Sequence, residues 1–256
     1  MIPETHRICV SASQAVALDW YPASTAARAA ALFVHGLGSN RRGEKALRFA
    51  DRFNEHGWSF ASLDLRGHGE SDGRTRDLTV TGMLADVHAA RTWIAERGVR
   101  EPLFLIGTSM GGAVVAWYAL QHPEGVSSLA LIAPSLQFPR RLAQQIGEAG
   151  MREWRSTGTR TWKNQWIDLE LGYGIVEDAA RYSPETLSEQ LAKPTLIIHG
   201  MRDEVLDWHD NLTFARQCAF SAVELLLCKD GDHRMTDRKD FLFDVIWAWL
   251  DRLTLR

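Results

Sequence analysis

The sequence predicts an α/β fold in which a mostly parallel sheet is covered on both faces by helices. Short, continuous apolar segments alternate with amphipathic helical segments along most of the 256 residues. Parallel strands that are buried on both faces have this continuous apolar character. The segment 135–192 interrupts the alternation, which predicts one core domain, 1–134 with 193–256, that carries a single insertion.

The individual elements follow from the spacing of apolar residues. Two short strands, 8–10 and 15–21, flank residues 11–13 and are predicted to form an antiparallel hairpin. Continuous apolar runs predict further strands at residues 31–34, 58–63, 103–106, 128–132, 194–198 and 223–227. Apolar side chains spaced three and four apart predict helices at residues 45–56, 81–96, 113–120, 207–218 and 241–253.

The insertion 135–192 is predicted to be a small helical cap (a lid) over the strand ends, because it is too long for a plain loop. Its apolar residues at helical spacing are Leu142, Ile146, Trp162, Trp166 and Leu169. The tryptophans Trp154, Trp162 and Trp166 allow two interpretations. They either line an apolar pocket for an acyl or aryl group, or they pack the cap against the main domain.

Composition excludes several classes of partner. The net charge is −3, from 29 basic and 32 acidic residues, and no basic cluster occurs, so neither nucleic acid nor an anionic membrane is indicated. No apolar run is long enough to span a membrane, and the first residues lack the layout of a signal peptide. We therefore expect a cytoplasmic protein without stable membrane insertion. The three cysteines are widely spaced and indicate reduced core thiols. Neither a cofactor nor an oligomeric state is indicated.

The segment 107–111, Gly-Thr-Ser-Met-Gly, carries the strongest chemical signal. It lies between a predicted strand and a predicted helix, which is the context that a G-x-S-x-G nucleophile elbow requires. Glycines two residues to either side of Ser109 allow a turn so tight that bulky side chains there would collide. Such a turn exposes the Ser109 hydroxyl and leaves the N–H of Met110 free at a helix N-terminus. Ser109 is therefore the predicted nucleophile.

The segment 35–38, His-Gly-Leu-Gly, follows the strand 31–34 and predicts a second backbone donor. The N–H of Leu37 is expected to join that of Met110 in binding a developing oxyanion. A phosphate-binding loop is excluded because no Gly-Lys-Ser/Thr follows. His35 and Gly36 are candidates for contact with the substrate, and the alternative is a tight turn with a buried histidine.

Asp203 and His233 each come directly after a predicted strand, and the order Ser, Asp, His is the one expected with this elbow. His233 is predicted to take the proton of Ser109 and to return it to the leaving group. Asp203 is predicted to fix the imidazole tautomer and to stabilise the imidazolium. Glu204 is adjacent and Asp207 is near, although Asp207 fits better as the N-cap of a helix that begins at Trp208.

Other polar residues near these strand ends have alternative interpretations. His35, His68 and His199 are further histidines, but their segments precede or flank other strands. A metal site at His199, Asp203 and His209 lacks the His-Glu-x-x-His or paired Cys/His spacing that would support it, so no metal is predicted. The charges of the segment 64–71 are predicted to hold that loop in place.

Together these segments resemble the α/β-hydrolase family across nearly the whole chain. The matching segments are 35–38, 64–71, 107–112, 194–203 and 231–233. Within the family, the chain is most similar to monoacylglycerol-lipase-like enzymes and to cinnamoyl or feruloyl esterases, which carry a short cap in the same place. The resemblance implies eight strands, the second antiparallel to the rest. It also implies Ser109, Asp203 and His233 as a catalytic triad, with the amides of Leu37 and Met110 as the oxyanion hole.

The predicted function is a serine carboxylesterase that cleaves small to medium acyl or aryl esters through an acyl-enzyme on Ser109. Haloalkane dehalogenases and epoxide hydrolases carry a carboxylate in place of Ser109, so these activities are excluded. A thioesterase, a peptidase or a carbon–carbon bond hydrolase uses the same chemistry and remains open. A peptidase needs an acidic group for the substrate amine, and the cap offers Glu148, Glu153, Glu170 and Glu177. A non-catalytic receptor is the alternative from a different class.

Overall fold

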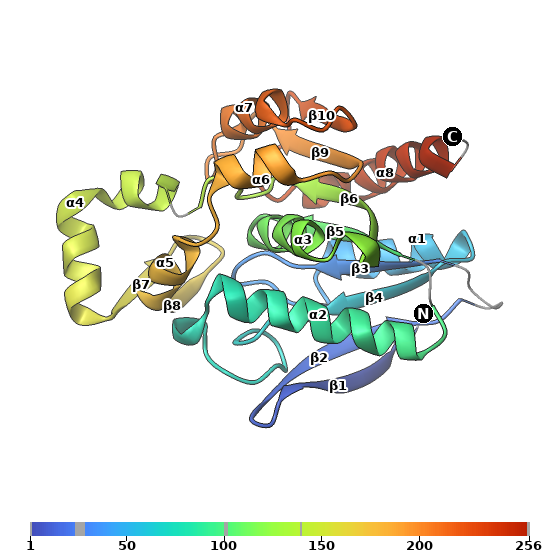
Figure 1. Cartoon of the computed structure of the whole chain (residues 1–256), viewed down its shortest axis with the longest axis horizontal. Coiled ribbons are helices and arrows are strands. Elements are labelled where there is room, and N and C mark those ends of the chain that lie inside the picture. Colours follow the sequence, from blue (N-terminus) through green and yellow to red (C-terminus); the bar gives the residue numbers. More distant parts are fainter. Residues whose placement is uncertain (1, 24–28, 100–101, 139, 255–256) are drawn as a thin grey trace.

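An eight-stranded sheet forms the centre of the molecule (Figure 1). The computed structural model describes residues 2–23, 29–99, 102–138 and 140–254. The strands of the sheet are β1 (Glu4–Ser11), β2 (Gln14–Tyr21), β3 (Ala30–Val34), β4 (Ser59–Leu63), β5 (Leu103–Thr108), β6 (Val126–Ile132), β9 (Thr195–Gly200) and β10 (Val223–Cys228). Their order is β1-β2-β4-β3-β5-β6-β9-β10. β2 is antiparallel to β1 and β4, and the remaining neighbours are parallel, which confirms the predicted sheet.

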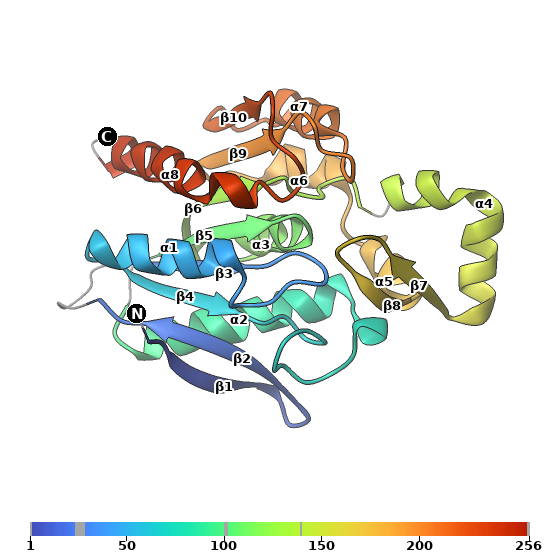
Figure 2. The ribbon, with the colours of Figure 1, turned by 180° about the vertical axis from the view of Figure 1, so that it is seen from behind.

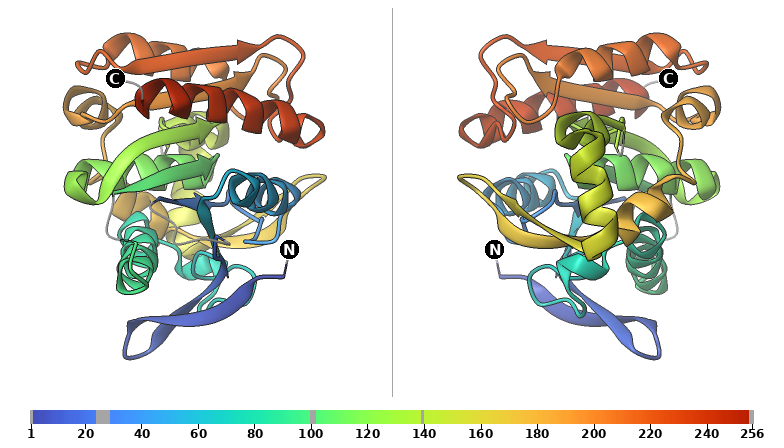
Figure 3. Two further views of the ribbon diagram at one scale, coloured as in Figure 1. Left: turned by 90° about the vertical axis from the view of Figure 1, so that its right-hand side faces the viewer. Right: turned by 90° about the vertical axis from the view of Figure 1, so that its left-hand side faces the viewer.

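Helices cover both faces of the sheet, as the edge-on views of Figure 3 show. The helices of the core are α1 (Glu44–Glu55), α2 (Val80–Glu96), α3 (Met110–Gln121), α7 (Trp208–Gln217) and α8 (Lys239–Thr254). Single 3₁₀ turns are η1 (Thr75–Asp77), η2 (Pro123–Gly125) and η3 (Thr236–Arg238). Helices α2, α3 and α7 lie on one face, and α1 and α8 lie on the other (Figures 1 and 2).

The continuous apolar character of the central strands follows from this layering. On β5, Leu103 and Leu105 belong to the hydrophobic core beneath α2 and α3, whereas Phe104 and Ile106 belong to the core beneath α1 and α8. Because successive side chains of a strand point to opposite faces, a strand covered on both sides must be apolar at every position.

The predicted elements of the core occur with small shifts at their ends. α3 begins at Met110 rather than at residue 113, because the chain passes directly from strand to helix at Ser109. The helix α7 begins at Trp208, and the Asp207 side chain accepts a hydrogen bond from the His209 N–H at 3.0 Å, as expected for an N-cap. Cys9 was expected in the core, and this is wrong, because it is exposed on the edge strand β1.

The segment 135–192 differs from the expected helical cap. It contains the helices α4 (Arg140–Thr157), α5 (Gly174–Ala179) and α6 (Pro184–Gln190), and also an antiparallel pair of strands, β7 (Thr159–Lys163) and β8 (Asp168–Gly172). Trp162 and Leu169 were expected on a helix, but they are paired partners in this hairpin. The Asn164 side chain accepts hydrogen bonds from the backbone N–H groups of Trp166 and Ile167, at 2.8 and 3.0 Å, and so stabilises a turn.

α4, β7, β8 and α5 project from the core at one end of the sheet (Figures 1 and 2). α6 instead contacts α3 and α7 of the core. The boundaries 135 and 192 that the sequence predicts for the cap therefore stay a prediction. Among the described residues, no helix is both long and apolar enough to cross a membrane.

Candidate active site

Ser109 lies at the sharp turn between β5 and α3, with backbone angles φ 50° and ψ −118°. A non-glycine residue with positive φ is strained, and such strain persists only where the surroundings enforce it. A Cβ on Gly107 would lie 2.5 Å from the Gly111 carbonyl oxygen, and one on Gly111 would lie 2.3 Å from the carbonyl oxygen of Val34. Both glycines are thus required by close backbone approach, as the elbow motif predicts.

Substitution of Gly111 by alanine is expected to lower the free energy of unfolding by about 2–3 kcal/mol, because overpacking at a rigid contact has costs of this order. The added methyl would collide with backbone oxygens of Val34 and His35, at 2.3 and 2.4 Å, and these cannot move without disturbing β3. Urea denaturation monitored by circular dichroism measures the change. Gly174→Ala is a useful comparison, because a Cβ there meets nothing within 4 Å and the backbone of Gly174 does not have a positive φ. Equal losses in the two variants would contradict the packing argument.

Asp203 and His233 reach Ser109 because β9 and β10 are parallel neighbours whose carboxyl ends lie together. His233 Nε2 lies 3.2 Å from Ser109 Oγ, and His233 Nδ1 lies 2.7 Å from Asp203 Oδ2. The other carboxylate oxygen, Oδ1, accepts hydrogen bonds from the N–H groups of Val205 and Leu206, both at 2.8 Å. The three residues predicted as a triad thus form one continuous chain of contacts.

The Asp203 carboxylate is anionic at all ordinary pH values. Burial raises its pKa, but the hydrogen bonds from His199 and His233 and the charge of His233 outweigh burial and hold the pKa well below its usual range. The Asp203 side chain is fully buried, whereas that of His233 is 14% exposed. An ionised carboxylate beside a histidine that reaches the cavity is the arrangement needed to stabilise an imidazolium during proton transfer.

The loop 35–38 is held by two neutral histidines. His35 Nδ1 lies 2.7 Å from the Gly36 carbonyl oxygen, and His35 Nε2 accepts a hydrogen bond from the N–H of Leu65 at 3.1 Å. His68 Nε2 accepts one from the N–H of Gly38, also at 3.1 Å. Burial, with the neighbouring His68, lowers the pKa of His35 to about 3, so His35 stays uncharged. These contacts position the backbone around Leu37.

Two predicted substrate contacts do not fit the structure. His35 is buried and does not line the cavity beside Ser109, although Gly36 does. Trp154 is also buried, its Nε1–H donates to the Leu171 carbonyl oxygen at 3.0 Å, and its ring packs edge-on against Tyr173. Trp154 thus packs within the cap, whereas Trp162 and Trp166 line the cavity.

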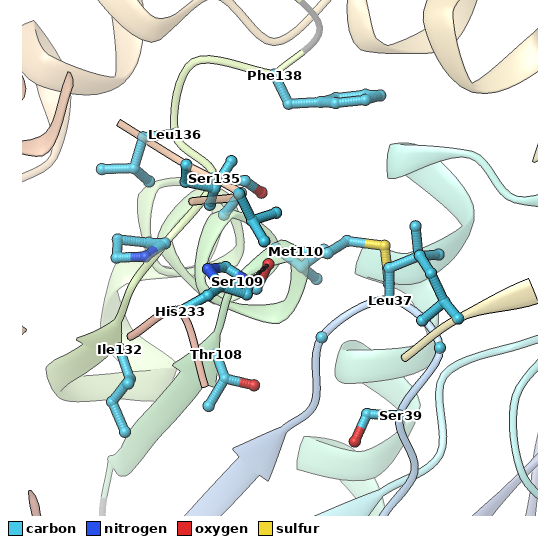
Figure 4. A pocket seen from close by; sticks show the side chains of 18 of the residues that line it. Leu37, Ser39, Thr108, Ser109, Met110, Ile132, Ser135, Leu136, Phe138 and His233 are labelled. Atoms are coloured by element: carbon cyan, nitrogen blue, oxygen red, sulfur yellow. Dashed lines mark hydrogen bonds between the residues drawn. The ribbon is translucent and has the colours of Figure 1, made fainter. Parts of the chain in front are cut away.

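The cavity beside Ser109 has a volume of about 310 Å³ and lies between the core and the projecting segment. Figure 4 shows His233 next to Ser109, with Leu37 and Met110 on one side and Leu136 on the other. The wall also includes apolar residues that the sequence did not mark as part of a site, because no motif contains them: Val80, Met83, Val114, Trp117, Leu136, Phe138, Leu142, Leu171 and Ile175. The N–H of Met110 lies at the N-terminus of α3, where it has no intrahelical acceptor.

The structure also shows where the alternatives to Asp203 and the possible metal ligands lie. Glu204 is exposed, and Asp207 caps α7 and contacts His209. His199 Nε2 lies 2.8 Å from Asp203 Oδ2, a contact that sequence analysis did not assign. In the part of the chain that the structure describes, no group of three or more His, Cys, Asp or Glu side chains is arranged to hold a metal ion.

Comparison with known proteins finds a family and several relatives. The family model described as serine aminopeptidase, S33, matches residues 25–178. The mitochondrial palmitoyl-protein thioesterase ABHD10 of Rattus norvegicus is 30% identical over 217 residues, which cover 82% of this chain and 70% of that protein. The monoacylglycerol lipase ABHD6 of Homo sapiens is 28% identical over 204 residues, covering 64% of this chain and 59% of the lipase. The structure of mouse α/β-hydrolase domain-containing protein 10 superposes with a TM-score of 0.84, at 25% identity, over 98% of this chain and 99% of that chain.

Proposed function

Because the chain belongs to the serine aminopeptidase S33 family and has the α/β-hydrolase fold, we propose that it is a serine hydrolase that cleaves carboxylic esters through an acyl-enzyme. The observation that carries the proposal is the chain of contacts from Ser109 Oγ through His233 to Asp203, at 3.2 and 2.7 Å. Ser109 and His233 line a cavity, and Ser109 lies at the N-terminus of α3.

The proposed reaction has two halves. Ser109 Oγ attacks the ester carbonyl carbon while His233 Nε2 takes the hydroxyl proton, and the N–H groups of Leu37 and Met110 stabilise the oxyanion. His233 then protonates the leaving alcohol as the carbon–oxygen bond breaks, which leaves an acyl group on Ser109. In the second half, His233 takes a proton from water as the water oxygen attacks the acyl carbon. His233 then returns this proton to Ser109 Oγ as the bond between the acyl carbon and Oγ breaks, and the carboxylic acid leaves.

The cavity supports small to medium substrates. Its volume of about 310 Å³ lies at the small end of the usual range for ligand pockets, about 300–1,000 Å³. Trp117 from α3 and Ile175 from α5 line it, so both the core and the projecting segment contribute apolar wall. We propose that this wall binds the acyl or aryl group, with Trp162 and Trp166 at the side of the projecting segment.

The charges around the cavity favour an ester over a peptide with a free amino terminus. Among the described residues, the acidic side chains that line it are Glu44, Asp207 and Asp210. Glu44 lies 3.6 Å from Lys239, and Arg141 pairs with both Asp207 and Asp210. The cap glutamates considered for an aminopeptidase, Glu148, Glu153, Glu170 and Glu177, do not line it. A substrate ammonium group would therefore have to displace an existing partner.

A thioesterase is the second candidate, because the ABHD10 relatives are named as palmitoyl-protein thioesterases. Thioesters pass through the same oxyanion and acyl-enzyme, so the site described above serves both. The same names describe those relatives as mitochondrial. The cytoplasmic location expected from the sequence therefore stays a prediction.

The proposal is tested by the rate of hydrolysis of p-nitrophenyl esters from acetate to palmitate, alongside matched acyl thioesters and aminoacyl p-nitroanilides. We expect the highest kcat/KM at short to medium acyl esters, and labelling of Ser109 by a fluorophosphonate. Faster cleavage of the anilides would indicate a peptidase, and a preference for thioesters would indicate a thioesterase. A folded protein that neither turns over these substrates nor is labelled would be a receptor rather than an enzyme.

Activity is expected to fall at acidic pH, because His233 accepts a proton only in its neutral form. A general base must be unprotonated to act, so kcat/KM should fall progressively as the pH is lowered into the acidic range. Protonation of Asp203 adds no second step to this pH profile, because the pKa of Asp203 is held well below its usual range. The measurement is kcat/KM for one ester from pH 4 to 9. A flat profile would contradict the role of His233 as general base.

A further inference from the structure

A second histidine contacts the carboxylate that orients His233. His199 lies at the end of β9 and is fully buried, and its Nε2 lies 2.8 Å from Asp203 Oδ2, the same oxygen that contacts His233. The other ring nitrogen of His199, Nδ1, lies 2.7 Å from Nδ2 of Asn211, a buried residue of α7. The reaction described above uses neither His199 nor Asn211.

The hydrogen-bond partners of Asn211 show which atom donates and which accepts in each of these contacts. Asn211 Nδ2 also donates to the Pro134 carbonyl oxygen at 3.1 Å, so the amide nitrogen has two acceptors within reach. Turning the amide over would place its oxygen against the Pro134 carbonyl oxygen. The amide of Asn211 therefore donates to His199 Nδ1, which must accept, and the ring proton of His199 lies on Nε2. From there it is donated to Asp203 Oδ2.

The Asp203 carboxylate then has all of its acceptor positions occupied. Oδ1 accepts from the N–H groups of Val205 and Leu206, and Oδ2 accepts from His199 and His233. A carboxylate offers about four lone-pair sites, so no further acceptor position remains and the group cannot rotate without breaking bonds. Without His199, Oδ2 would be held by His233 alone, the residue that must move protons during the reaction.

We propose that His199 and Asn211 are positioning residues, which hold the Asp203 carboxylate in the orientation that keeps His233 aligned with Ser109. The inference rests on the proposed function, because it concerns the same proton transfer. Asn211 fixes the tautomer of His199, and His199 fixes Oδ2. Both act through Asp203 and neither reaches the cavity. Loss of His199 should thus affect kcat while leaving substrate binding intact.

The test compares three substitutions of His199 by steady-state kinetics on the best ester substrate. His199→Leu removes both polar contacts, and His199→Asn keeps an acceptor for Asn211 but is too short to reach Asp203. We expect both to lower kcat by about 10- to 100-fold with KM changed less than about threefold, because small misplacements of catalytic groups have effects of this size. His199→Gln carries an N–H at the position of Nε2 and an acceptor near Nδ1, and it should recover kcat to within about fivefold of the wild type.

Thermal unfolding of each variant shows whether a lower kcat comes from a loss of stability. Kinetics of Ser109→Ala in the same assay distinguish a failure of this inference from a failure of the proposed function. If Ser109→Ala keeps its activity, the proposed function fails. If Ser109→Ala is inactive but folded His199→Leu or His199→Asn keeps kcat within about twofold, the positioning role is wrong. It is also wrong if His199→Gln is no better than His199→Leu, because His199 would then only fill space.

Discussion

Ser109→Ala is expected to lower kcat for ester hydrolysis by about 10⁶-fold, because removal of the nucleophile from a serine triad has effects of this order. The structure presents the Ser109 hydroxyl at a strained turn, 3.2 Å from His233 Nε2, and alanine leaves His233 with no proton to accept. We expect a residual rate above that of the uncatalysed hydrolysis in water, because the oxyanion donors and the cavity remain. KM should change little, because the hydroxyl contributes little to binding the ground state.

The matched control is Ser135→Ala, since Ser135 lines the same cavity and contacts Ser109 through its backbone N–H at 3.1 Å. That contact does not involve the Ser135 side chain, so we expect kcat within a few-fold of the wild type. Active-site labelling with a fluorophosphonate should be lost in Ser109→Ala and kept in Ser135→Ala. Ester hydrolysis within tenfold of the wild type in Ser109→Ala would place the nucleophile elsewhere.

Much of the fold and of the candidate site could be predicted because each depends on local pattern. Continuous apolar runs identify strands that are buried on both faces, and Phe104 and Leu105 of β5 do enter opposite cores. The polar segments that follow those strands meet because parallel strands end at one edge of the sheet. The contacts of Ser109, Asp203 and His233 agree with what their order and positions after strands predict.

What sequence analysis missed depends on contacts between distant residues. Trp162 and Leu169 have a spacing that suits a helix, but the turn at Asn164 pairs them across a hairpin. Trp154 and Trp166 share a residue type, yet one is buried and the other is 41% exposed, because only packing decides which faces the cavity. Asn211 gives no signal of its contact with His199, which arises from the way α7 packs against β9.

Asp203→Asn is expected to lower kcat by about 10⁴-fold, because it reverses the tautomer of His233 rather than removing a side chain. The N–H groups of Val205 and Leu206 both donate to Oδ1 at 2.8 Å, so the amide oxygen of the new residue must take that position. The amide nitrogen then replaces Oδ2 and faces His199 and His233. His233 Nδ1 must accept from it, which moves the ring proton to Nε2, opposite Ser109 Oγ. A nitrogen that already carries a proton cannot take the proton of Ser109.

Kinetics of Asp203→Asn and of Glu204→Gln on one ester test this argument. The two substitutions make the same chemical change at adjacent positions, and Glu204 is exposed, so we expect Glu204→Gln to keep kcat within about twofold. The loss in Asp203→Asn should appear in kcat with little change in KM, because the cavity wall is unchanged. An equal loss in both variants would mean that net charge matters, rather than the hydrogen bonds of one carboxylate. Activity in Asp203→Asn close to that of the wild type would show that the tautomer of His233 is fixed by another group.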